Sequence, residues 1–410
     1  MQNLEHRAGA TDVLPLNECR VIGILNGPEL FGHERANITV FESLRSCGAE
    51  VTVGVTQFAN ESSTIRAVER LGFETFRMPF GSQWSKRIFL QQPAWLLKNA
   101  ARVFRCSRVL GQQISRLRAT HIHIGNPLVY SYIAPLLFSR PEIQLVYRMG
   151  DEPPVGLNRL IWRACLTRAD RVVANSEFVR QSIRSACRTR TDIQLIYNTV
   201  SEAGGSPANT KEGKIPFRVL YVGQISRHKG ILEFVNAAIT LCKRNYDCCF
   251  DIVGGSRYTL KMERLISEQI FNSGFSSRIR MHGHVDDPGG YYRDATLLVV
   301  PSLFEEPAAN VVLEAKAYGV PAIVFPSGGL PELIVEGVTG WVCKYKSEVA
   351  LVEQLERCLA DPDSCHKMSG NCVEEAIERF GSDRFARLWS MIYHNAEFAL
   401  TSSGQGRQAA

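Results

Sequence analysis

The chain has 410 residues, of which 45% are hydrophobic and 21% charged, and its formal net charge is +6. This length is roughly two to three times that of a typical domain, so two hydrophobic cores are expected. The ordinary composition excludes a fibrous or low-complexity chain, and no apolar run approaches the roughly 18 residues of a membrane span. Because residues 1–18 are polar and carry acids, we expect no signal peptide and a cytoplasmic protein.

The cysteines and histidines do not form the patterns of a metal or redox site. The twelve cysteines stand singly or as the adjacent pair Cys248 and Cys249, without CxxC spacing, and the histidines form no HExxH motif. We interpret the cysteines as small buried hydrophobic residues. His121 and His123 alternate in a short strand-like run, which is typical of a strand rather than of a metal site. No metal and no cofactor are expected.

The first half of the chain alternates short β-rich runs with helical patterns. A helix is predicted over 34–48, because the apolar pattern there stops at Gly48 as a C-terminal glycine would make it. Strand, helix, strand order at this spacing predicts a parallel sheet that is covered by helices on both faces. The predicted strands are 20–25, 50–55, 73–78, 121–125, 143–149, 170–176 and 193–198.

A basic segment lies within this half. No acid occurs between Glu74 and Glu142, whereas ten lysines and arginines do, interleaved with Trp84, Phe89 and Trp95. Such a segment can lie on an anionic membrane surface, or it can be the solvated basic face of a helix, and the sequence leaves both interpretations open. Binding to nucleic acid is not expected, since no nucleic-acid-binding motif accompanies the segment.

The second half repeats the alternation after a polar stretch, 201–214, which is predicted to be a linker or exposed loop. The sequence thus predicts two domains, 18–200 and 215–380, and a final segment, 381–400. Two α/β halves place a cleft between them, with the chemistry in the loops beyond the carboxyl ends of the strands. The predicted strands of this half are 217–223, 250–255, 278–285, 296–302 and 321–327.

Cationic and glycine-containing loops follow these strands. Arg227 and Lys229 lie in the turn after the strand 217–223, where they can meet an anion beside a helix N-terminus. Taken alone, the two residues slightly favour a solvated basic turn. Gly254 follows the next strand and allows close backbone approach. Gly328 and Gly329 are predicted to open a helix that aims amides at an anion.

Two carboxylates stand eight residues apart in the segment 301–333. Glu306 lies in the loop after a predicted strand, and Glu314 lies on a helix that is predicted to begin near Ala308 and to end at Gly319. A bare pair of acids at this spacing is more often coincidence than function. Together with the cationic turn, however, the pair suits a phosphate ester that bears hydroxyl groups.

The segment "PSLFEEPAANVVLEAKAYGVPAIVFPSGGLPEL" resembles the hallmark segment of the family 4 retaining glycosyltransferases (glycosyl transferases group 1). "LYVGQISRHKG", "DIVGGS", "HGHV", "VVANSEF" and "IYNTV" are similar to other landmarks of this family, in the same order. The resemblance extends over roughly 20–400 and is specific from about 217 to 345. It implies the GT-B fold, two Rossmann-like domains facing a cleft, with a last helix that crosses back to the N-terminal domain.

The resemblance also implies roles for individual residues. The C-terminal half would bind a nucleotide-sugar donor, and the N-terminal half a glycan or lipid-linked acceptor. Glu306 would meet the donor sugar, Glu314 the ribose, and Lys229 the departing diphosphate, without a metal ion. The other residues that the resemblance places at the donor are Gly32, Gly223, Gln224, Gly254, Val285, Ala309 and Asn310.

Three positions depart from the family pattern. Gln224 stands where the family usually has an arginine, and we expect Arg227 to supply the missing charge. Ala308 and Ala309 replace a Phe-Gly pair, and Met149 stands where the family often has a histidine. Because of these departures, an epimerase of the same fold and a catalytically silent sugar-nucleotide-binding protein remain alternatives to a transferase.

Overall fold

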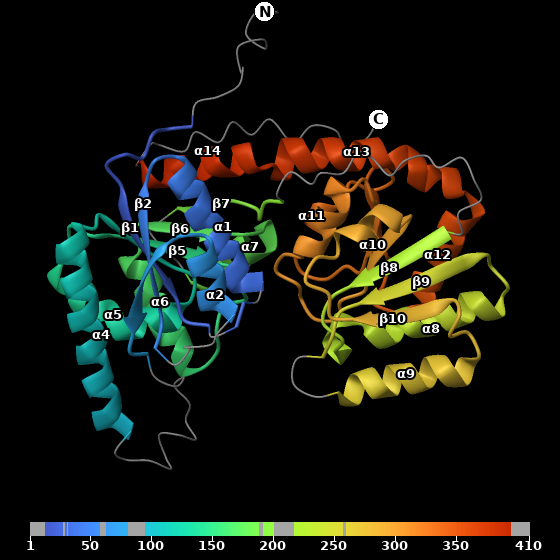
Figure 1. Ribbon diagram of the computed structural model, residues 1–410, viewed down its shortest axis with the longest axis horizontal. Coiled ribbons are helices and arrows are strands. Elements are labelled where there is room, and N and C mark those ends of the chain that lie inside the picture. The colour runs from blue at the N-terminus through green and yellow to red at the C-terminus, as the bar shows by residue number, and fades with distance from the viewer. Residues whose placement is uncertain are drawn as a thin grey trace, which may run out of the picture.

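The computed structural model describes residues 13–27, 29–30, 32–57, 63–80, 95–187, 192–200, 217–256 and 260–394. They form two lobes, each built on one parallel sheet with helices on both faces (Figure 1). The predicted fold class is therefore confirmed. The predicted linker, 201–214, lies outside the described residues.

The N-terminal sheet has seven strands in the order β3-β2-β1-β4-β5-β6-β7, and every neighbouring pair is parallel. Its first strand, β1, lies near the middle, so the chain winds outward in both directions as in a doubly wound fold. The described elements of this lobe are β1 (Arg20–Leu25), α1 (Gly32–Ser46), β2 (Glu50–Thr56), α2 (Ser63–Arg70), β3 (Glu74–Met78), α4 (Trp95–Leu117), β4 (His121–Ile124), α5 (Pro127–Ser139), β5 (Gln144–Met149), α6 (Leu157–Arg168), β6 (Arg171–Ala174), α7 (Glu177–Ala186) and β7 (Ile193–Leu195).

The C-terminal sheet has six strands in the order β10-β9-β8-β11-β12-β13, again all parallel. The described elements of this lobe are β8 (Phe217–Val222), the 3-10 turn η1 (Arg227–Lys229), α8 (Ile231–Lys243), β9 (Cys248–Val253), α9 (Lys261–Ser273), β10 (Ile279–Gly283), α10 (Gly289–Asp294), β11 (Leu297–Val300), α11 (Asn310–Ala317), β12 (Ala322–Val324), the 3-10 turn η2 (Pro331–Leu333), β13 (Gly340–Val342), α12 (Glu348–Ala360) and α13 (Pro362–Phe380).

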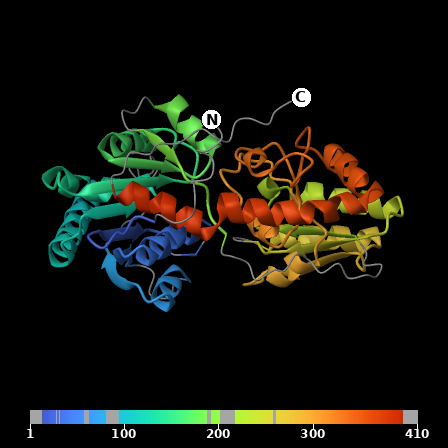
Figure 2. The same cartoon turned by 90° about the horizontal axis from the view of Figure 1, so that it is seen from above.

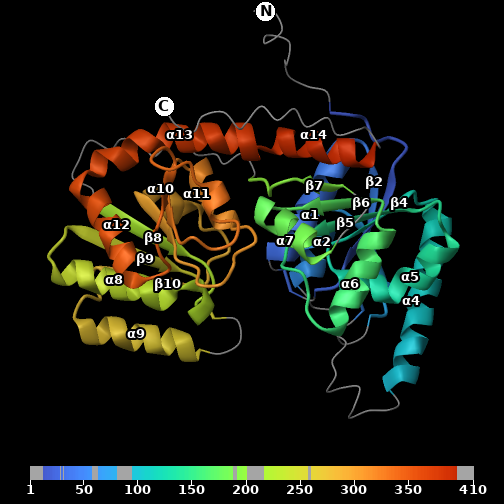
Figure 3. The same ribbon diagram turned by 180° about the vertical axis from the view of Figure 1, so that it is seen from behind.

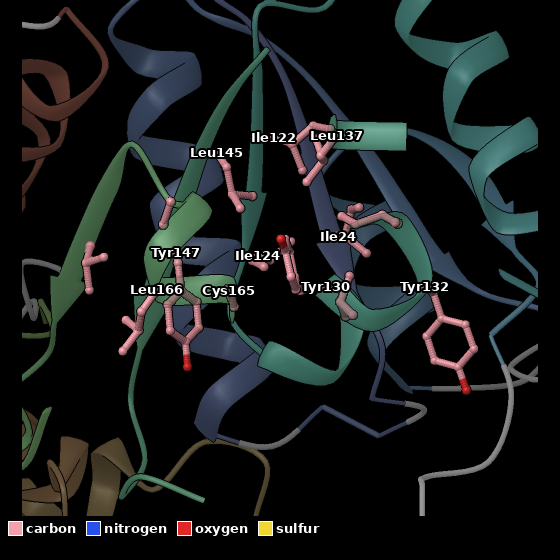
Figure 4. Packing of buried hydrophobic residues seen from close by; sticks show 14 of the residues in the cluster. Ile24, Ile122, Ile124, Tyr130, Tyr132, Leu137, Leu145, Tyr147, Cys165 and Leu166 are labelled. Carbon is pink, nitrogen blue, oxygen red and sulfur yellow. The ribbon is translucent and has the colours of Figure 1, made fainter. Parts of the chain in front are cut away.

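Side chains of β5 alternate between two hydrophobic clusters on opposite faces of the N-terminal sheet. Leu145, Tyr147 and Met149 belong to the cluster beneath α5 and α6, part of which is drawn in Figure 4. Val146 belongs to the cluster on the other face, which contains Trp389. This period of two means that the next residue on the Val146 side is Arg148, a charged residue at the carboxyl end of the strand.

The last helices join the lobes. Helix α13 lies on the C-terminal lobe, and α14 (Ser382–Tyr393) follows it onto the N-terminal lobe, as Figures 1 and 2 show. Trp389 and Tyr393 of α14 are fully buried there against α1 and the sheet. Burying a large aromatic side chain contributes roughly 2 to 3 kcal/mol, so α14 ties the two lobes together through apolar contacts.

Several local predictions differ from the structure. Strand β13 was not predicted, because three residues are too few for a clear pattern. Helix α11 begins at Asn310 rather than near Ala308, and Gly328 and Gly329 are followed only by the short turn η2.

All twelve cysteines are free, and nine of them are buried. In the part of the chain that the structure describes, no helix has both the length and the hydrophobicity to cross a membrane.

A buried polar chain connects α14 to the start of α1. The ring of His123, which is fully buried, has its Nδ1 2.8 Å from the Tyr393 hydroxyl and its Nε2 3.2 Å from Oδ1 of Asn37. Asn37 in turn donates from Nδ2 to the carbonyl of His33. Burial lowers the pKa of His123 to about 3 and that of His121 to about 4, so both rings are neutral in the folded state.

These two histidines predict a loss of stability in acid. Because unfolding restores a pKa near 6.5, the unfolded chain binds more protons below that pH, and stability falls as the pH drops from about 6.5 toward 4. Each histidine contributes a slope of about 1.4 kcal/mol per pH unit. We expect His123→Gln to lower stability at pH 7 and to reduce the slope by up to about 1.4 kcal/mol per pH unit, measured by urea unfolding between pH 7 and 5. An unchanged slope in the variant would contradict the assignment.

Candidate functional site

A pocket of about 330 Å³ lies between the lobes, at the carboxyl ends of both sheets. The N-terminal lobe contributes the start of α1 and the residues that follow β5 and β6. The C-terminal lobe contributes the end of β8, Lys229, and the loop from β11 to α11. This is the position at which a doubly wound sheet binds ligands, and Figure 3 shows the same facing ends of the lobes from behind.

An ion pair between Lys229 and Glu306 lies in this pocket. The Lys229 Nζ lies 2.9 and 2.7 Å from the two carboxylate oxygens of Glu306, and the Ser302 hydroxyl donates to one of them at 3.0 Å. Glu306 is 6% exposed. The Lys229 ammonium also lies 4.8 Å from the ring centroid of Phe304. The carboxylate is thus held in a fixed orientation by charged and hydroxyl donors.

Glu314 lies on α11 outside the residues that line the described pocket. Its Oε2 accepts a hydrogen bond of 2.8 Å from the Tyr292 hydroxyl. Burial raises the pKa of the Glu314 carboxyl, and the Tyr292 bond and the charge of Arg35 in part oppose this shift. Arg35 belongs to α1, so a side chain of the N-terminal lobe acts electrostatically on a carboxyl of the other lobe.

The glycines of the loops have different roles. Gly254 has φ +143°, and a Cβ there would lie 1.8 Å from the carbonyl oxygen of Gly223, so this glycine lets two strand ends meet. A Cβ on Gly32 would meet nothing within 4 Å, and Gly32 and Gly223 both line the pocket. Gly328 donates its amide to Glu305, and Gly329 donates its amide to the carbonyl of Glu306. The amides expected to face an anion are therefore used inside the loop.

Two acids outside the pair hold the loops of the cleft. Glu305 also pairs with Lys346 at 2.6 Å, and so it fixes the loop beside Gly328. Glu332 of the C-terminal lobe accepts from the amides of Glu177 and Phe178, at 2.7 and 2.6 Å, at the start of α7 in the other lobe. A carboxylate at a helix N-terminus satisfies free amides and meets the positive end of the helix dipole.

Comparison with known families covers both lobes. Residues 32–199 match the glycosyl transferase 4-like domain, and residues 206–374 match the family described as glycosyl transferases group 1. The chain belongs to the group 1 glycosyl transferases. The resemblance seen in the sequence is therefore confirmed, and so is the GT-B arrangement of two facing lobes.

Individual relatives of this glycosyltransferase are distant. It is 23% identical over 299 residues to the N-acetyl-alpha-D-glucosaminyl L-malate synthase of Bacillus anthracis, which covers 69% of this chain and 76% of that protein. It is 26% identical over 168 residues to a capsular polysaccharide biosynthesis glycosyltransferase of Staphylococcus aureus, and the chain spans only 43% of that protein. The match covers 40% of this chain. An Anabaena protein solved with UDP and glucose has the same fold, with a TM-score of 0.74, 17% identity, and 91% of this chain and 99% of that chain covered.

The structure brings most of the predicted site residues of this glycosyltransferase together. Gly32, Gly223, Gln224, Lys229, Glu306, Ala309 and Asn310 line the pocket. Ala309 is the N-cap of α11 and Asn310 its first residue. Val285 instead packs against the hydrophobic cluster around α11, and Gly254 and Glu314 lie behind the pocket-lining residues.

Arg227 is placed differently from Lys229. Its side chain is 60% exposed and pairs with Glu233 on α8 at 3.3 Å, and it is not among the residues that line the described pocket. The charge that we expected from Arg227 at Gln224 is therefore directed toward α8 in this structure.

Met149 lies in the hydrophobic core and not in the pocket. Its side chain is 2% exposed and lies in the hydrophobic cluster of the N-terminal sheet, whereas its neighbour Arg148 lines the pocket. Sequence reasoning did not assign a role to Arg148, His33, Asn175, Asn198 or Ser302, all of which line the pocket. The alternation of β5 was the one signal that could have found Arg148. Among the described residues, no group of three His, Cys, Asp or Glu gathers as metal ligands.

The Tyr292 bond to Glu314 gives a testable titration. In Tyr292→Phe the carboxylate loses the hydroxyl that stabilises its charged form, so we expect the raised pKa of Glu314 to rise further, by about one unit. Carbon-13 NMR of labelled glutamate, with Glu314→Gln to assign the signal, measures this. Tyr318→Phe is a control, because that ring stacks on Tyr292. A pKa that is unchanged in Tyr292→Phe would show that burial alone sets the value.

Proposed function

We propose that the protein is a retaining, metal-independent glycosyltransferase that moves a sugar from a nucleotide-sugar donor to an acceptor hydroxyl. The single observation that carries this proposal is the Lys229–Glu306 pair, held in the interlobe pocket beside the N-terminus of α11. A cation, free helix amides and an oriented carboxylate are the groups that a diphosphate linked to a sugar requires.

In the proposed complex, the donor lies on the C-terminal lobe. Its diphosphate approaches Lys229 and the first amides of α11, and the donor-sugar hydroxyls donate to Glu306. Glu314 accepts from the ribose. Entry of the donor thus exchanges the Lys229–Glu306 bonds for bonds to substrate, and the buried carboxylate stays satisfied throughout.

The chemical step depends on charge that develops at the diphosphate. As the bond from the sugar to the phosphate breaks, negative charge gathers on the phosphate oxygens, and Lys229 with the helix amides stabilises it. The acceptor hydroxyl attacks from the same face and passes its proton to the departing phosphate. No side-chain nucleophile takes part in this scheme, and Glu306 positions the sugar.

The acceptor would bind to the N-terminal lobe, near His33 and Asp151. The Staphylococcus relative is named for capsular polysaccharide biosynthesis, which supports a glycan or lipid-linked acceptor. Action at the cytoplasmic face of a membrane is part of the proposal. Of the possible donors, a UDP-sugar has support from the fold neighbour that was solved with UDP and glucose. A GDP-sugar is the second candidate.

One experiment separates this proposal from its two rivals. The purified protein is incubated with UDP-, GDP- and dTDP-sugars and with a membrane extract. Release of nucleoside diphosphate together with a glycosylated product supports transfer. An isomerised donor would instead support an epimerase, and binding without turnover would support a silent sugar-nucleotide-binding protein.

The role of Glu306 predicts a large loss of activity on substitution. Glu306→Ala removes the carboxylate that receives the sugar hydroxyls and leaves Lys229 unpaired, so we expect transfer to fall by at least about 100-fold in a folded protein. Initial rates of diphosphate release measure this, with circular dichroism as the check on folding.

The adjacent acid provides the matched control. Glu305→Ala removes a carboxylate that pairs with Lys346 and the Gly328 amide, so it should keep most of the activity. Near-normal turnover in Glu306→Ala would refute the proposed role of the pair.

A second candidate function is docking of the N-terminal lobe on an anionic membrane. One face of α4 is buried through Cys106, Leu110 and Ile114. The opposite face exposes Arg105, Arg108 and Phe104, the last of which is 67% exposed. Basic side chains beside an exposed aromatic ring suit an interface with anionic lipid. Of the predicted basic segment, residues 81–94 lie outside the described residues.

Docking through this face predicts that binding to vesicles depends on lipid charge. Each arginine contributes about 1 kcal/mol near an anionic surface, so Arg105→Glu with Arg108→Glu should reduce binding to vesicles of phosphatidylglycerol and phosphatidylcholine by about 30-fold or more. Flotation on a density gradient measures the bound fraction, and pure phosphatidylcholine vesicles are the control. Binding that is insensitive to anionic lipid and to salt would contradict docking through this face.

A further inference from the structure

Arg148 is a buried cation that the scheme above does not use. It is the penultimate residue of β5 and lies on the face of the sheet opposite Met149. It is 1% exposed and lines the interlobe pocket. Burial lowers its pKa to about 10, and so the guanidinium is protonated at neutral pH. A buried charge is costly unless it is paired or has a ligand to meet.

The hydrogen bonds of this guanidinium are incomplete. Its Nη2 donates to Oδ1 of Asn198 at 2.5 Å, whereas its Nε is buried and has no partner. Asp151 attracts it electrostatically, but that carboxylate is 79% exposed and its recorded ion pair is with His33. Within the described ranges no carboxylate forms an ion pair with Arg148. The guanidinium of this pocket-lining residue thus has a buried donor that no protein group satisfies.

Asn198 connects Arg148 to the other lobe. Its Nδ2 donates to Oδ1 of Asn310 at 2.6 Å, and Asn310 is the first residue of α11. One amide side chain therefore separates the guanidinium from the helix start whose free amides face the pocket. Gly150 adds no side chain near it, and a Cβ there would stand 3.6 Å from Nη1.

The charge balance of the pocket indicates which ligand these donors meet. The Lys229 charge is matched by Glu306, and Gln224 is neutral. Asp151, the other carboxylate among the described lining residues, is 79% exposed and lies 3.9 Å from His33. Arg227 is paired with Glu233 outside the pocket. A nucleoside diphosphate carries at least two negative charges, which one lysine does not balance. Arginine also presents several donors in a fixed plane, and this suits phosphate oxygens.

We propose that Arg148 is a phosphate-binding residue of the donor site, which reaches the diphosphate from the N-terminal lobe and supplies the charge that Gln224 lacks. This inference rests on the proposed function. The diphosphate would then contact Arg148 in one lobe and Lys229 and α11 in the other.

The test compares each nucleoside diphosphate with its parent nucleoside, which lacks only the phosphates. Isothermal titration calorimetry is run with UDP, GDP, ADP and dTDP, and with the parent nucleosides, on the unmodified protein and on Arg148→Met. We expect the variant to bind the preferred diphosphate about 10- to 100-fold more weakly, as loss of a buried charge-assisted bond implies, and to bind the nucleoside within about threefold of the unmodified protein.

Three further variants sharpen the comparison. Arg148→Lys keeps a cation without the planar fork and should show an intermediate loss for the diphosphate, which tests the same point if methionine at 148 prevents folding. Arg227→Met is the rival arm, since it removes the arginine that sequence reasoning favoured. Arg244→Met removes an exposed arginine that pairs with Glu356, far from the pocket, and is the matched control.

The outcomes separate the two proposals. If the folded variants at 148 bind the diphosphate like the unmodified protein, or if only Arg227→Met loses affinity, the role of Arg148 is refuted while the donor site stands. Lost transfer with unchanged diphosphate affinity would also refute it, because the arginine would then serve the acceptor. If the unmodified protein binds none of the four diphosphates, the proposed function itself fails.

Discussion

The architecture depends on one constraint, the direction of parallel strands. Every strand of both sheets runs the same way as its neighbours, so each sheet gathers all its carboxyl-terminal loops at one edge. Helix α14 then ties the lobes together, because its Trp389 and Tyr393 are buried in a hydrophobic cluster of the N-terminal lobe. The pocket forms only because two such edges meet, and this brings together Lys229, Glu306, Arg148 and the start of α11.

Within that arrangement, charge decides what the pocket can do. In the Lys229–Glu306 pair the ammonium contacts both oxygens of a buried carboxylate, whereas the lysine side chain is 27% exposed. A partly buried pair of this kind gives up part of its attraction to desolvation. The pair holds both side chains in a fixed orientation. A ligand anion can replace the carboxylate beside Lys229, and a ligand hydrogen-bond donor can replace the ammonium beside Glu306. The pocket is therefore polar and fully bonded around Glu306, yet it keeps unpaired donors at Arg148.

Sequence reasoning predicted the fold and seven of the 22 residues that line the pocket, and the reasons for its failures are physical. Strand boundaries agreed within a few residues, because the buried strands are continuous apolar runs with clear ends. Glu306, Lys229 and Asn310 follow strand ends, where topology alone brings them together. The direction of a side chain in a turn is not fixed in this way. Arg227 turns to Glu233 for that reason.

For Arg148 and Met149, too, sequence reasoning did not decide which of two neighbouring side chains faces the pocket. A strand alternates its side chains between two faces, so neighbours in sequence face a core and a cleft respectively. The identity of the residue at a family position is then less informative than the face on which it lies. Here the apolar neighbour faces the core and the charged one faces the pocket, and this agrees with the burial preferences of the two side chains.

The contacts that cross the cleft are of a different kind from those of α14. Glu332 caps α7 through two amides, Asn198 bonds Asn310, and Arg35 acts on Glu314 through its charge. The hydrogen bonds of Glu332 and Asn198 are polar contacts that water or a ligand can replace at a net cost of about 1 kcal/mol each. The apolar contact of α14 is not exchangeable in this way. The lobes are thus joined by buried apolar contacts at one end and by exchangeable polar contacts across the cleft.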